Sequence, residues 1–296
     1  MTTVRYVMIT PVRNEGDFLA ATIDSVTGQT VRPVEWIIVN DGSTDRTGEI
    51  IDAASVKHSW IRSLHRSDRG FRKPGGGVME AFHDGLARLQ TVEWDFLVKL
   101  DGDLTFDADY FDKCFKRFSA NPKLGIGGGL VCNEVAGRQV LDSTDDPKFH
   151  VRGATKIYRR ACWDAIGGLI RATGWDTMDE VKANMLGWKT STFSEIPLVH
   201  HRKTGEADGC WRNWFKNGRA NYNVGYHPLF MLGKCVKRAF RRPYGVASLA
   251  LGCGFVSGYF SRVPQRITDR NLIRYLRGEQ LRALLGRKCL WRAYEV

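Results

Sequence analysis

Two aspartates, Asp101 and Asp103, lie one residue apart at the end of the apolar run "FLVKL" (96–100). Gly102 stands between them and leaves room for a bulky ligand because it has no side chain. Hard divalent cations prefer carboxylate oxygens and keep coordination positions open for substrate phosphates. Two carboxylates at i and i+2 on a loop are one way to hold such an ion. The alternative is that Asp101 caps a turn and Asp103 is solvated, because a D-G-D triplet is short and common.

The elements that must position these acids are visible in the first hundred residues. Three nearly continuous apolar runs, 6–10, 35–41 and 94–101, are typical of parallel strands buried on both faces. The stretches 15–29 and 44–57 between them are predicted helices, which gives βαβ units and an open, doubly wound α/β sheet. Ligands of such sheets bind beyond the carboxyl ends of the strands. Each of the three runs ends in polar groups at that edge: "TPVRNE", "NDGSTD" and "DGD".

Asp41 ends the second run, where a carboxylate can accept hydrogen bonds from a nucleobase imide or from ribose hydroxyls. The glycine-rich stretches at 73–85 and 125–130 do not complete G-x-G-x-x-G between a strand and a helix. No Walker A loop is present either. The pattern therefore argues against a Rossmann dehydrogenase and against a P-loop enzyme.

The net charge of +12 is unevenly distributed along the chain. Residues 1–200 hold 25 Lys/Arg and 27 Asp/Glu, whereas residues 201–296 hold 19 and 5. The positive charge therefore belongs to the C-terminal part. The seven cysteines are widely spaced and form no C-x-x-C, so neither a disulfide framework nor a zinc knuckle is predicted, and a reducing cytoplasm is expected. No secretion signal is seen at the N-terminus.

The C-terminal part contains two segments that suit a membrane surface. Residues 245–260 carry no charge, but a sixteen-residue helix reaches only about 24 Å, short of a ~30 Å hydrocarbon core. An interfacial or buried helix is therefore predicted there rather than a spanning one. Residues 265–288 place leucines and isoleucine at near-helical spacing with arginines alongside, which predicts a basic amphipathic helix. Packing against an anionic membrane and packing against the rest of the protein are equally compatible with that pattern.

Several motifs occur together in a recognisable order. "MITPVRNEGDFLAATIDSVTGQT", "EWIIVNDGSTDRTGEI" and "FLVKLDGDLTF" resemble the nucleotide-sugar-binding half of family 2 glycosyltransferases, and "KIYRRACWDAIGG", "GWDTMDEVKANMLGWKT" and "EIPLVHHRKTG" resemble the family's later segments. The resemblance covers about residues 5–205. It implies a GT-A-like three-layer sandwich with a mostly parallel central sheet in a catalytic domain at 1–205. A basic, aromatic, mostly helical C-terminal region is expected at 206–296.

The resemblance also implies roles for individual residues. Pro11, Glu15 and Asp41 would line the nucleotide site, while Asp103, with Asp101 nearby, would bind Mg²⁺ or Mn²⁺ bridging the diphosphate. A divalent cation offsets the negative charge that develops on a departing nucleoside diphosphate. His200, at the end of a late strand, is a further candidate metal ligand. Candidate donors to the phosphates are Arg202 and Lys203 after that strand, and Arg69, Arg72 and Lys73 in the loop "DRGFRKPGGG". The alternative is that both segments are solvated basic loops.

An acceptor hydroxyl must lose its proton as it attacks the anomeric carbon, so a carboxylate is needed as general base. Three acids compete for this role in "GWDTMDEV": Asp176, Asp179 and Glu180. Alignment back from "LGW" places Asp176 where the family has an aspartate, while Trp175 stands where a glutamate is expected. Asp176 is the first candidate and Asp179 the second, and Glu180 is expected to support the start of the helix.

These observations predict a metal-dependent, inverting glycosyltransferase that uses a nucleotide-sugar donor, by family habit a UDP-sugar. The expected acceptor is a glycan or a lipid-linked glycan, as in cell-surface polysaccharide assembly. The expected location is the cytoplasm, peripheral on the inner face of an anionic membrane. One rival is a nucleotidyltransferase acting on a sugar phosphate, which also uses acids and a metal. The other is a nucleic-acid-binding module, suggested by aromatics among basic residues at 210–227, although no nucleic acid is expected because the folded half lacks positive charge.

Overall fold

The computed structural model describes residues 4–70, 76–135, 138–142, 146–171, 173–202, 209–242, 244–261 and 267–292. Arg72, Lys73 and Lys203 lie outside the described residues, as does the domain boundary expected near residue 205.

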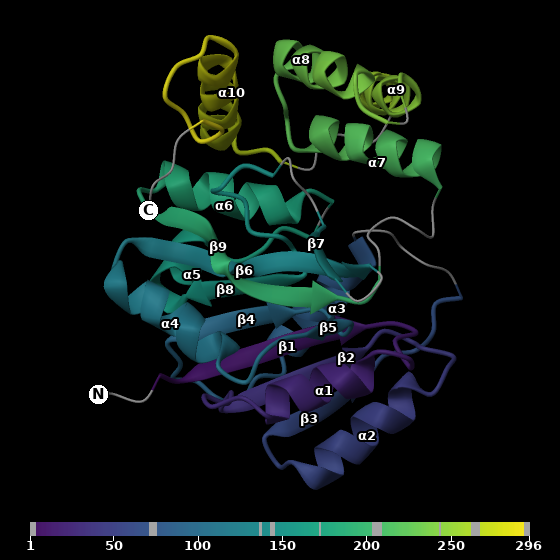
Figure 1. Ribbon diagram of the computed structural model, residues 1–296, viewed down its shortest axis with the longest axis vertical. Helices are drawn as coiled ribbons and strands as arrows, with labels where there is room; N and C mark the ends of the chain where they lie inside the picture. Colours follow the sequence, from purple (N-terminus) through teal and green to yellow (C-terminus); the bar gives the residue numbers. More distant parts are fainter. Residues whose placement is uncertain are drawn as a thin grey trace.

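A central mixed sheet carries the N-terminal two thirds of the chain, in the order β3-β2-β1-β4-β8-β6-β9-β5, with β7 paired to β6 (Figure 1). The strands β3, β2, β1 and β4 are parallel to one another, and β8 joins β4 in antiparallel register. The strand bounds are β1 Tyr6–Val12, β2 Glu35–Asn40, β3 Ile61–His65, β4 Phe96–Leu100, β5 Leu104–Thr105, β6 Leu124–Val135, β7 Arg138–Leu141, β8 Thr155–Arg159 and β9 Lys189–His200.

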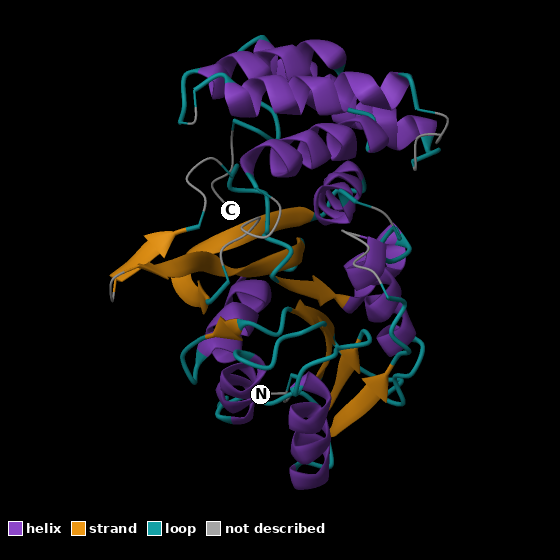
Figure 2. Cartoon of the chain, turned by 90° about the vertical axis from the view of Figure 1, so that its right-hand side faces the viewer, coloured by secondary structure: helices purple, strands orange, loops and turns teal. Residues whose placement is uncertain are grey.

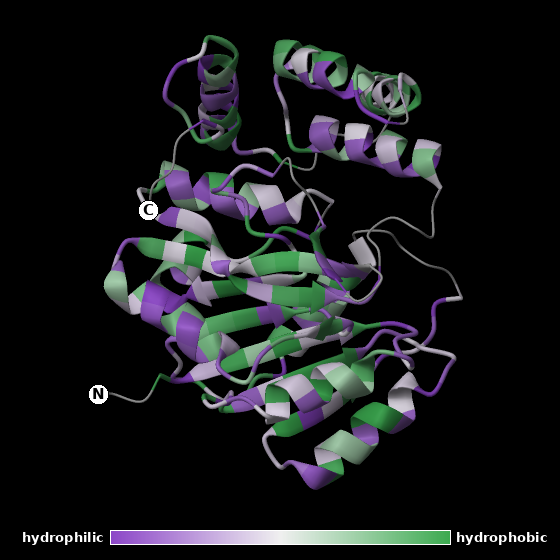
Figure 3. Cartoon of the chain, viewed as in Figure 1, coloured by the Kyte–Doolittle hydropathy of each residue, from purple (hydrophilic) through white to green (hydrophobic). Residues whose placement is uncertain are grey.

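Two layers of helices cover the sheet. One layer consists of α1 (Leu19–Thr27), α2 (Thr47–Lys57) and α4 (Tyr110–Ala120), whose buried side chains pack on alternate residues of β1, β2 and β4 such as Met8 and Val98. The other consists of α3 (Gly76–Leu86), α5 (Arg160–Ile166) and α6 (Trp175–Met185), which pack on the intervening residues such as Ile9 and Leu97. Both neighbours in each strand are therefore buried, as continuous apolar runs require. The expected three-layer α/β sandwich is confirmed, and Figure 3 shows the inner strands as predominantly hydrophobic.

The strands expected at 6–10, 35–41 and 94–101 correspond to β1, β2 and β4, and the helices expected at 15–29 and 44–57 correspond to α1 and α2. Both helices begin three to four residues later than predicted. The residues before them, including Asn14 with its positive φ of 55°, form loops at the carboxyl edge of the sheet. Asn14 and Gly16 there bond to Ser43 and Asp45 of the loop after β2.

Four C-terminal helices lie beyond α6, on the side of the molecule away from α1 and α2 (Figures 1 and 2). They are α7 (Cys210–Asn223), α8 (Pro228–Ala239), α9 (Val246–Tyr259) and α10 (Arg270–Leu284). Together with Met178 and Val181 of α6 they form a third hydrophobic cluster. The helical character expected of this region is therefore present, and the region is packed onto the sheet-bearing part through α6.

The two segments expected to suit a membrane differ in what they contact. In α10, Leu272, Leu276 and Ala283 are buried within the protein, so this amphipathic helix packs against the rest of the chain. The charge-free segment forms α9, which packs closely on α7. No helix among the described residues is both long and apolar enough to cross a bilayer.

Candidate active site

Acidic side chains gather at the carboxyl edge of the parallel strands, as predicted. Glu15 follows β1, Asp41 follows β2, and Asp101 and Asp103 follow β4. A side chain at Gly102 would overlap Val12 at 2.4 Å and meet Glu15 Cγ at 3.6 Å, so the D-G-D loop lies directly against the end of β1. Burial and the nearby carboxylates of Asp103 and Asp101 raise the pKa of Glu15 to about 8. The edge is thus a cluster of closely spaced acids that a cation would stabilise.

Asp103 and His200 form a largely buried pair within this cluster. Residue 104 of β5 pairs with residue 200 of β9, which brings His200 Nε2 to 3.2 Å from Asp103 Oδ2. The remaining polar atoms of the two side chains, Asp103 Oδ1 and His200 Nδ1, are buried and have no hydrogen-bond partner within the described part of the chain. Burial alone would lower the pKa of His200, but the carboxylates of Asp103 and Asp101 outweigh it and raise that pKa. Buried polar atoms without partners are uncommon and indicate an unsatisfied ligand position.

Asp101 is held differently from Asp103. Its carboxylate accepts a hydrogen bond from the buried ammonium of Lys99, which also donates to the carbonyl of Gly153. Burial, which outweighs the charge of Lys99, raises the pKa of Asp101. About a third of the Asp101 side chain remains exposed, so one side of the carboxylate faces the site.

Contacts with neighbouring residues also hold in place the side chains that are expected to border the nucleotide. Pro11 is buried in β1 beside Val39 of β2, and therefore shapes the edge through its ring rather than through a polar group. Arg202 donates to Glu15 across 2.8 Å and to the carbonyl of Asn14, so it lies at the same edge as the acids. The guanidinium of Arg202 thus lies beside Glu15 at the carboxyl edge of the sheet.

Asp41 is the anchor for a set of arginines. Its carboxylate binds Arg66 and forms a two-contact pair with Arg69 at 2.9 and 2.5 Å, while Arg13 donates to its carbonyl at 2.6 Å. Arg13 and Arg66 were not among the residues singled out in the sequence, because nothing in local spacing indicates that they converge on residue 41. These guanidiniums place positive charge beside the acidic cluster, as a site for phosphates requires.

The acids at the edge fit a divalent cation. Asp103 supplies a buried oxygen that has no hydrogen-bond partner in the part of the chain that the structure describes, and carboxylate and imidazole are suitable ligand types. Within the described residues, no three acidic, histidine or cysteine side chains converge closely enough to enclose an ion by themselves. Mg²⁺ is commonly held by one or two carboxylates, with waters and substrate phosphates completing the shell. Asp103, with His200 and the exposed side of Asp101, therefore fits a metal that is completed by a bound diphosphate.

The two candidate bases, Asp176 and Asp179, both lie on helix α6 but have different surroundings. Asp176 lies in the first turn, is partly exposed, and its carboxylate makes no hydrogen bond with any residue that the structure describes. The positive end of the helix dipole stabilises an ionised carboxylate there. Gly153 lies against it, since a Cβ at that position would stand 3.5 Å from Asp176 Cβ. Asp176 is thus positioned beside the loop that also holds Lys99, with an accessible carboxylate.

Asp179, in contrast, is a buried partner of Lys156. Both its oxygens accept from Lys156 at 3.0 Å, and Tyr158 donates to it at 2.6 Å. Glu180 lies 2.7 Å from Lys156 and 2.9 Å from His150. Burial, together with the neighbouring charge of Glu180, raises the pKa of Asp179 to about 6. These contacts favour a structural role for Asp179 and leave Asp176 as the accessible acid.

Trp175 connects the two halves of the site. Its buried ring has Lys99 at 5.4 Å on one side and Lys156 at 5.5 Å, both within the range of cation–π attraction. Lys156 also donates to the carbonyl of Asp176. The residue that stands where a glutamate was expected is therefore a packing link between the D-G-D loop and the acidic helix. Neither Lys99 nor Lys156 was predicted from the sequence: Lys99 is a single lysine in the apolar strand β4, and Lys156 lies in the short mixed strand β8.

Residues 7–169 match the model of the family described as "Glycosyl transferase family 2". Among curated proteins, glycosyltransferase GlyG of Streptococcus pneumoniae is 36% identical over 96 residues, which cover 32% of this chain and 29% of that protein. The putative glycosyltransferase EpsH of Bacillus subtilis is 24% identical over 222 residues, 66% of this chain and 60% of that protein. The chain spans about a third or less of the length of the first relatives it matches.

Solved structures share the fold. The mannosyltransferase PcManGT from Pyrobaculum calidifontis, in complex with GDP-Man and Mn²⁺, superposes with a TM-score of 0.59 at 17% identity, covering 88% of each chain. TarS 1–349 of S. aureus with UDP-GlcNAc gives 0.53 at 17% identity over 95% of this chain and 81% of that one. These likenesses establish the GT-A-like architecture.

Proposed function

The chain belongs to glycosyl transferase family 2, and from this premise we propose that it transfers a sugar from a nucleotide-sugar donor, with a divalent metal and with inversion, to a hydroxyl of a glycan. The observation that carries the proposal is the Asp103–His200 pair, two of whose buried polar atoms have no hydrogen-bond partner among the described residues, at the carboxyl edge of the parallel strands beside Glu15 and Asp101. This membership favours sugar transfer over the alternatives of a nucleotidyltransferase and a nucleic-acid-binding module.

Asp103, His200 and Asp101 would hold Mg²⁺ or Mn²⁺. When bound, such an ion offsets the negative charge that develops on the departing nucleoside diphosphate. The chain's own cations act on the same group: Arg202 lies at the edge beside Glu15, and Arg69 is held toward the site by Asp41. Arginine is well suited to phosphate oxygens because its planar donors bind two oxygens at once. Asp41 and Pro11 would border the nucleoside.

Asp176 is proposed as the general base. Its partly exposed carboxylate would take the proton of the acceptor hydroxyl as that oxygen attacks the anomeric carbon, on the side opposite the diphosphate. One displacement at that carbon inverts its configuration. Lys156 holds the Asp176 carbonyl and thereby fixes the first turn of α6. Asp179 is kept away from the substrate by its burial under Lys156 and Tyr158.

We assign donor binding and catalysis to residues 1–205, and acceptor binding and membrane contact to residues 206–296. A UDP-sugar donor is proposed by analogy with TarS, whose structure contains UDP-GlcNAc, although PcManGT holds GDP-Man. The relatives include a chondroitin synthase of Pasteurella multocida and a poly-beta-1,6-N-acetyl-D-glucosamine synthase of Staphylococcus aureus. Their names support a role in polysaccharide synthesis, and the polysaccharide we propose is one of the cell surface, built on a glycan or lipid-linked acceptor.

Helices α8 and α9 present an exposed apolar surface that suits peripheral contact with a membrane. Ser248 of α9 bonds to the carbonyl of residue 235 in α8, so the two helices lie side by side. The apolar surface consists of exposed side chains on both of them: Leu229, Leu232, Val236, Phe240, Leu249, Val256, Tyr259 and Phe260. Phe240 is 77% and Phe260 85% exposed, unusual values for phenylalanine.

Charge favours an anionic bilayer as the partner of this surface. Residues 209–261 contain eight Lys/Arg and no Asp/Glu, and basic residues near a membrane surface gain about 1 kcal/mol each from anionic lipids. We therefore place the protein at the cytoplasmic face of the membrane. The double variant Leu232→Ser/Phe240→Ser should lose co-sedimentation with phosphatidylglycerol vesicles, while exposed Val56→Ser on α2 should not. Equal sedimentation of all three proteins would exclude the membrane assignment.

The catalytic proposal is tested by donor turnover, measured as nucleoside diphosphate released from UDP- and GDP-sugars with Mn²⁺ or with EDTA. Asp103→Ala should abolish the metal-dependent release and leave the far-ultraviolet circular dichroism spectrum unchanged. Asp112→Ala is the matched control, because Asp112 is an acid of α4 that pairs with the exposed Lys116, four residues along the same helix. Metal-dependent turnover by Asp103→Ala at the wild-type rate would remove Asp103 from the metal site.

A further inference from the structure

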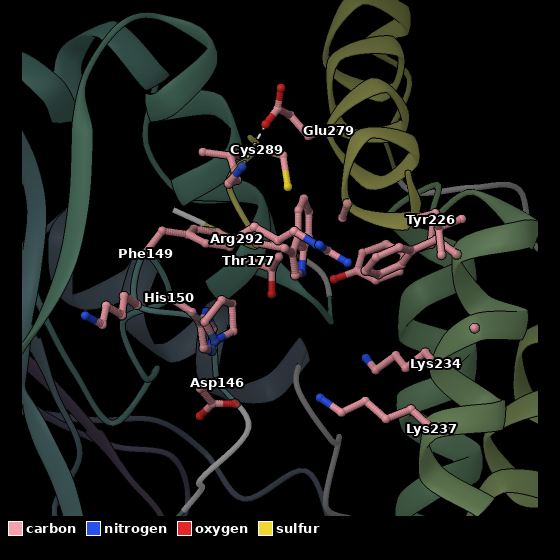
Figure 4. Close-up of a pocket in the computed structure, with 18 of the residues that line it drawn as sticks. Asp146, Phe149, His150, Thr177, Tyr226, Lys234, Lys237, Glu279, Cys289 and Arg292 are labelled. Atoms are coloured by element: carbon pink, nitrogen blue, oxygen red, sulfur yellow. Dashed lines mark hydrogen bonds between the residues drawn. The ribbon is translucent and has the colours of Figure 1, made fainter. Parts of the chain in front are cut away.

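A large cavity lies between the catalytic part of the chain and the C-terminal helices (Figure 4). Its volume is about 1870 Å³, well above the ~300–1,000 Å³ typical of small-molecule sites. One wall is formed by residues 146–152 and by Thr177 of α6, and the facing wall by α7, α8 and α10. The cavity is therefore large enough for a ligand longer than a monosaccharide.

The lining of the cavity is strongly basic. The described residues that line it include ten Lys/Arg and three Asp/Glu, an excess of positive charge. All three acids already have an arginine partner in the same lining: Arg152 binds Asp142 and lies 3.2 Å from Asp146, and Arg282 lies 2.7 Å from Glu279. Among the described residues of the lining, cations therefore outnumber acids, which favours an anionic ligand.

Lys234 and Lys237 of α8 extend into the cavity toward the wall that carries Asp146 and His150 (Figure 4). Lys234 makes no hydrogen bond or ion pair with any described residue, and its ammonium lies 5.6 Å from the centre of the Tyr226 ring. Lys234 is solvent-exposed where it lines the cavity, and the protein atoms around it lower its pKa by desolvation. An anion beside this ammonium would restore the stabilisation that desolvation removes.

Aromatic rings line the cavity together with these cations. Trp214, Tyr226, Phe230 and Trp291 contribute to the walls, and Arg238 stacks on Trp214 at 4.3 Å. Aromatic faces pack well against the apolar C–H faces of sugars, while lysine and arginine donate to phosphate oxygens. The combination suits a molecule that has both a sugar ring and a phosphate.

The cavity also adjoins the proposed catalytic base. Thr177 of the lining follows Asp176 directly, and His150 of the lining binds Glu180 of the same helix at 2.9 Å. An acceptor whose hydroxyl lies at Asp176 would therefore extend into this space. On α8, the lysines of the cavity and the exposed Leu232 and Val236 of the apolar surface belong to one helix, so a bilayer at that surface would lie close to the cavity.

We propose that this cavity binds the phosphate of a phosphate-bearing acceptor, through Lys234 and Lys237. The inference rests on the proposed function, since it names the class of acceptor for the same transfer reaction. The phosphate has two possible sources, a lipid carrier that bears the growing glycan or a soluble sugar phosphate. Both present the same chemistry to the lysines.

The test is calorimetric binding to the full chain in EDTA, which keeps a metal from recruiting phosphates to the D-G-D edge. The probes are farnesyl diphosphate, α-D-glucose 1-phosphate and uncharged octyl glucoside. At least one phosphate probe should bind the wild type, and octyl glucoside should bind at least tenfold more weakly than that probe. The double variant Lys234→Gln/Lys237→Gln should lower the affinity for the phosphate probe at least tenfold. Arg270→Gln/Arg274→Gln is the matched control, because it removes two exposed charges of α10 that do not line the cavity.

Tighter binding of farnesyl diphosphate would assign the phosphate to a lipid carrier, and tighter binding of glucose 1-phosphate to a sugar phosphate. The proposal is overturned if neither phosphate probe binds, or if both double variants weaken binding equally, since general positive charge would then suffice. Nucleotide binding with Mn²⁺ is measured in parallel on all variants and should not change. Failure of the nucleotide to bind even the wild type would count against the proposed function, separately from the cavity.

Discussion

The contrast between Asp176 and Asp179 gives the sharpest prediction about the acidic helix. Asp179→Ala removes a carboxylate whose side chain is 1% exposed, and takes away two contacts of Lys156 and the acceptor of the Tyr158 hydroxyl. Removing one partner of a buried ion pair costs about 3–5 kcal/mol of unfolding free energy. Glu180 remains 2.7 Å from Lys156 and retains part of the pairing. Because the pKa of Asp179 is raised to about 6, its ionisation at pH 7 also opposes folding. The lower end, about 3 kcal/mol, is therefore expected.

For a chain of this size, each kcal/mol shifts Tm by about 2 °C, so Asp179→Ala should lower Tm by about 6 °C. The control is Asp164→Ala, which removes an exposed carboxylate paired with Arg160 on α5 and should cost less than about 1 kcal/mol. Thermal unfolding followed by circular dichroism gives both values, and donor turnover is measured well below both transitions. A Tm equal to that of the wild type, together with lost turnover, would refute the structural role and move the base to Asp179.

Three further predictions follow from the same contacts. Asp176→Asn should lower kcat by about 10²-fold or more with donor affinity and Tm unchanged, because the variant loses a proton acceptor and no buried contact; full kcat in steady-state assays would exclude this base. His150 faces Glu180, Asp176 and Lys156, and the carboxylates raise its pKa above 6.5 although burial opposes the shift. The stabilisation from protonated His150 is therefore complete below pH 6.5 and is lost as pH rises through the folded-state pKa. The difference in Tm between wild type and His150→Asn should shrink from pH 6 to pH 9, and a constant difference would contradict the assignment. Gly218→Ala places a Cβ 2.1 Å from the Leu251 carbonyl, where α7 and α9 pack closely, and should cost about 1–3 kcal/mol in urea unfolding, whereas Gly278→Ala, with open space around it, should not.

The sequence predicted those parts of the fold that local patterns encode. Continuous apolar runs located β1, β2 and β4, and the polar residues that follow them placed Glu15, Asp41 and Asp103 at one edge. The uncharged run at 245–260 predicted an interfacial or buried helix, which corresponds to α9, because the run can be recognised from neighbouring residues alone. What the helices contact was not predictable, since the apolar positions of α10 have the same spacing whether they meet protein or lipid.

The parts of the site that were missed depend on contacts between distant residues. Lys156 reaches Asp179 from a strand 23 residues earlier, and Arg66 reaches Asp41 from the end of the neighbouring strand β3. No local sequence pattern around a single lysine or arginine indicates which acid it will pair with. Trp175 shows the same limit, because its place between Lys99 and Lys156 follows from the packing of β4, β8 and α6 rather than from its neighbours in sequence.

The central claim is that the D-G-D edge holds a nucleotide through a metal, and calorimetric titration of the purified protein tests it most directly. UDP, GDP and their sugar conjugates are titrated in Mn²⁺ and in EDTA, into the wild type and into Asp103→Asn, which keeps the shape of the side chain and removes its charge. We predict that one nucleoside diphosphate binds in Mn²⁺, that EDTA abolishes the binding, and that Asp103→Asn weakens it at least tenfold. Binding that is equally tight in EDTA, or no binding of any nucleotide to the wild type, would contradict the account.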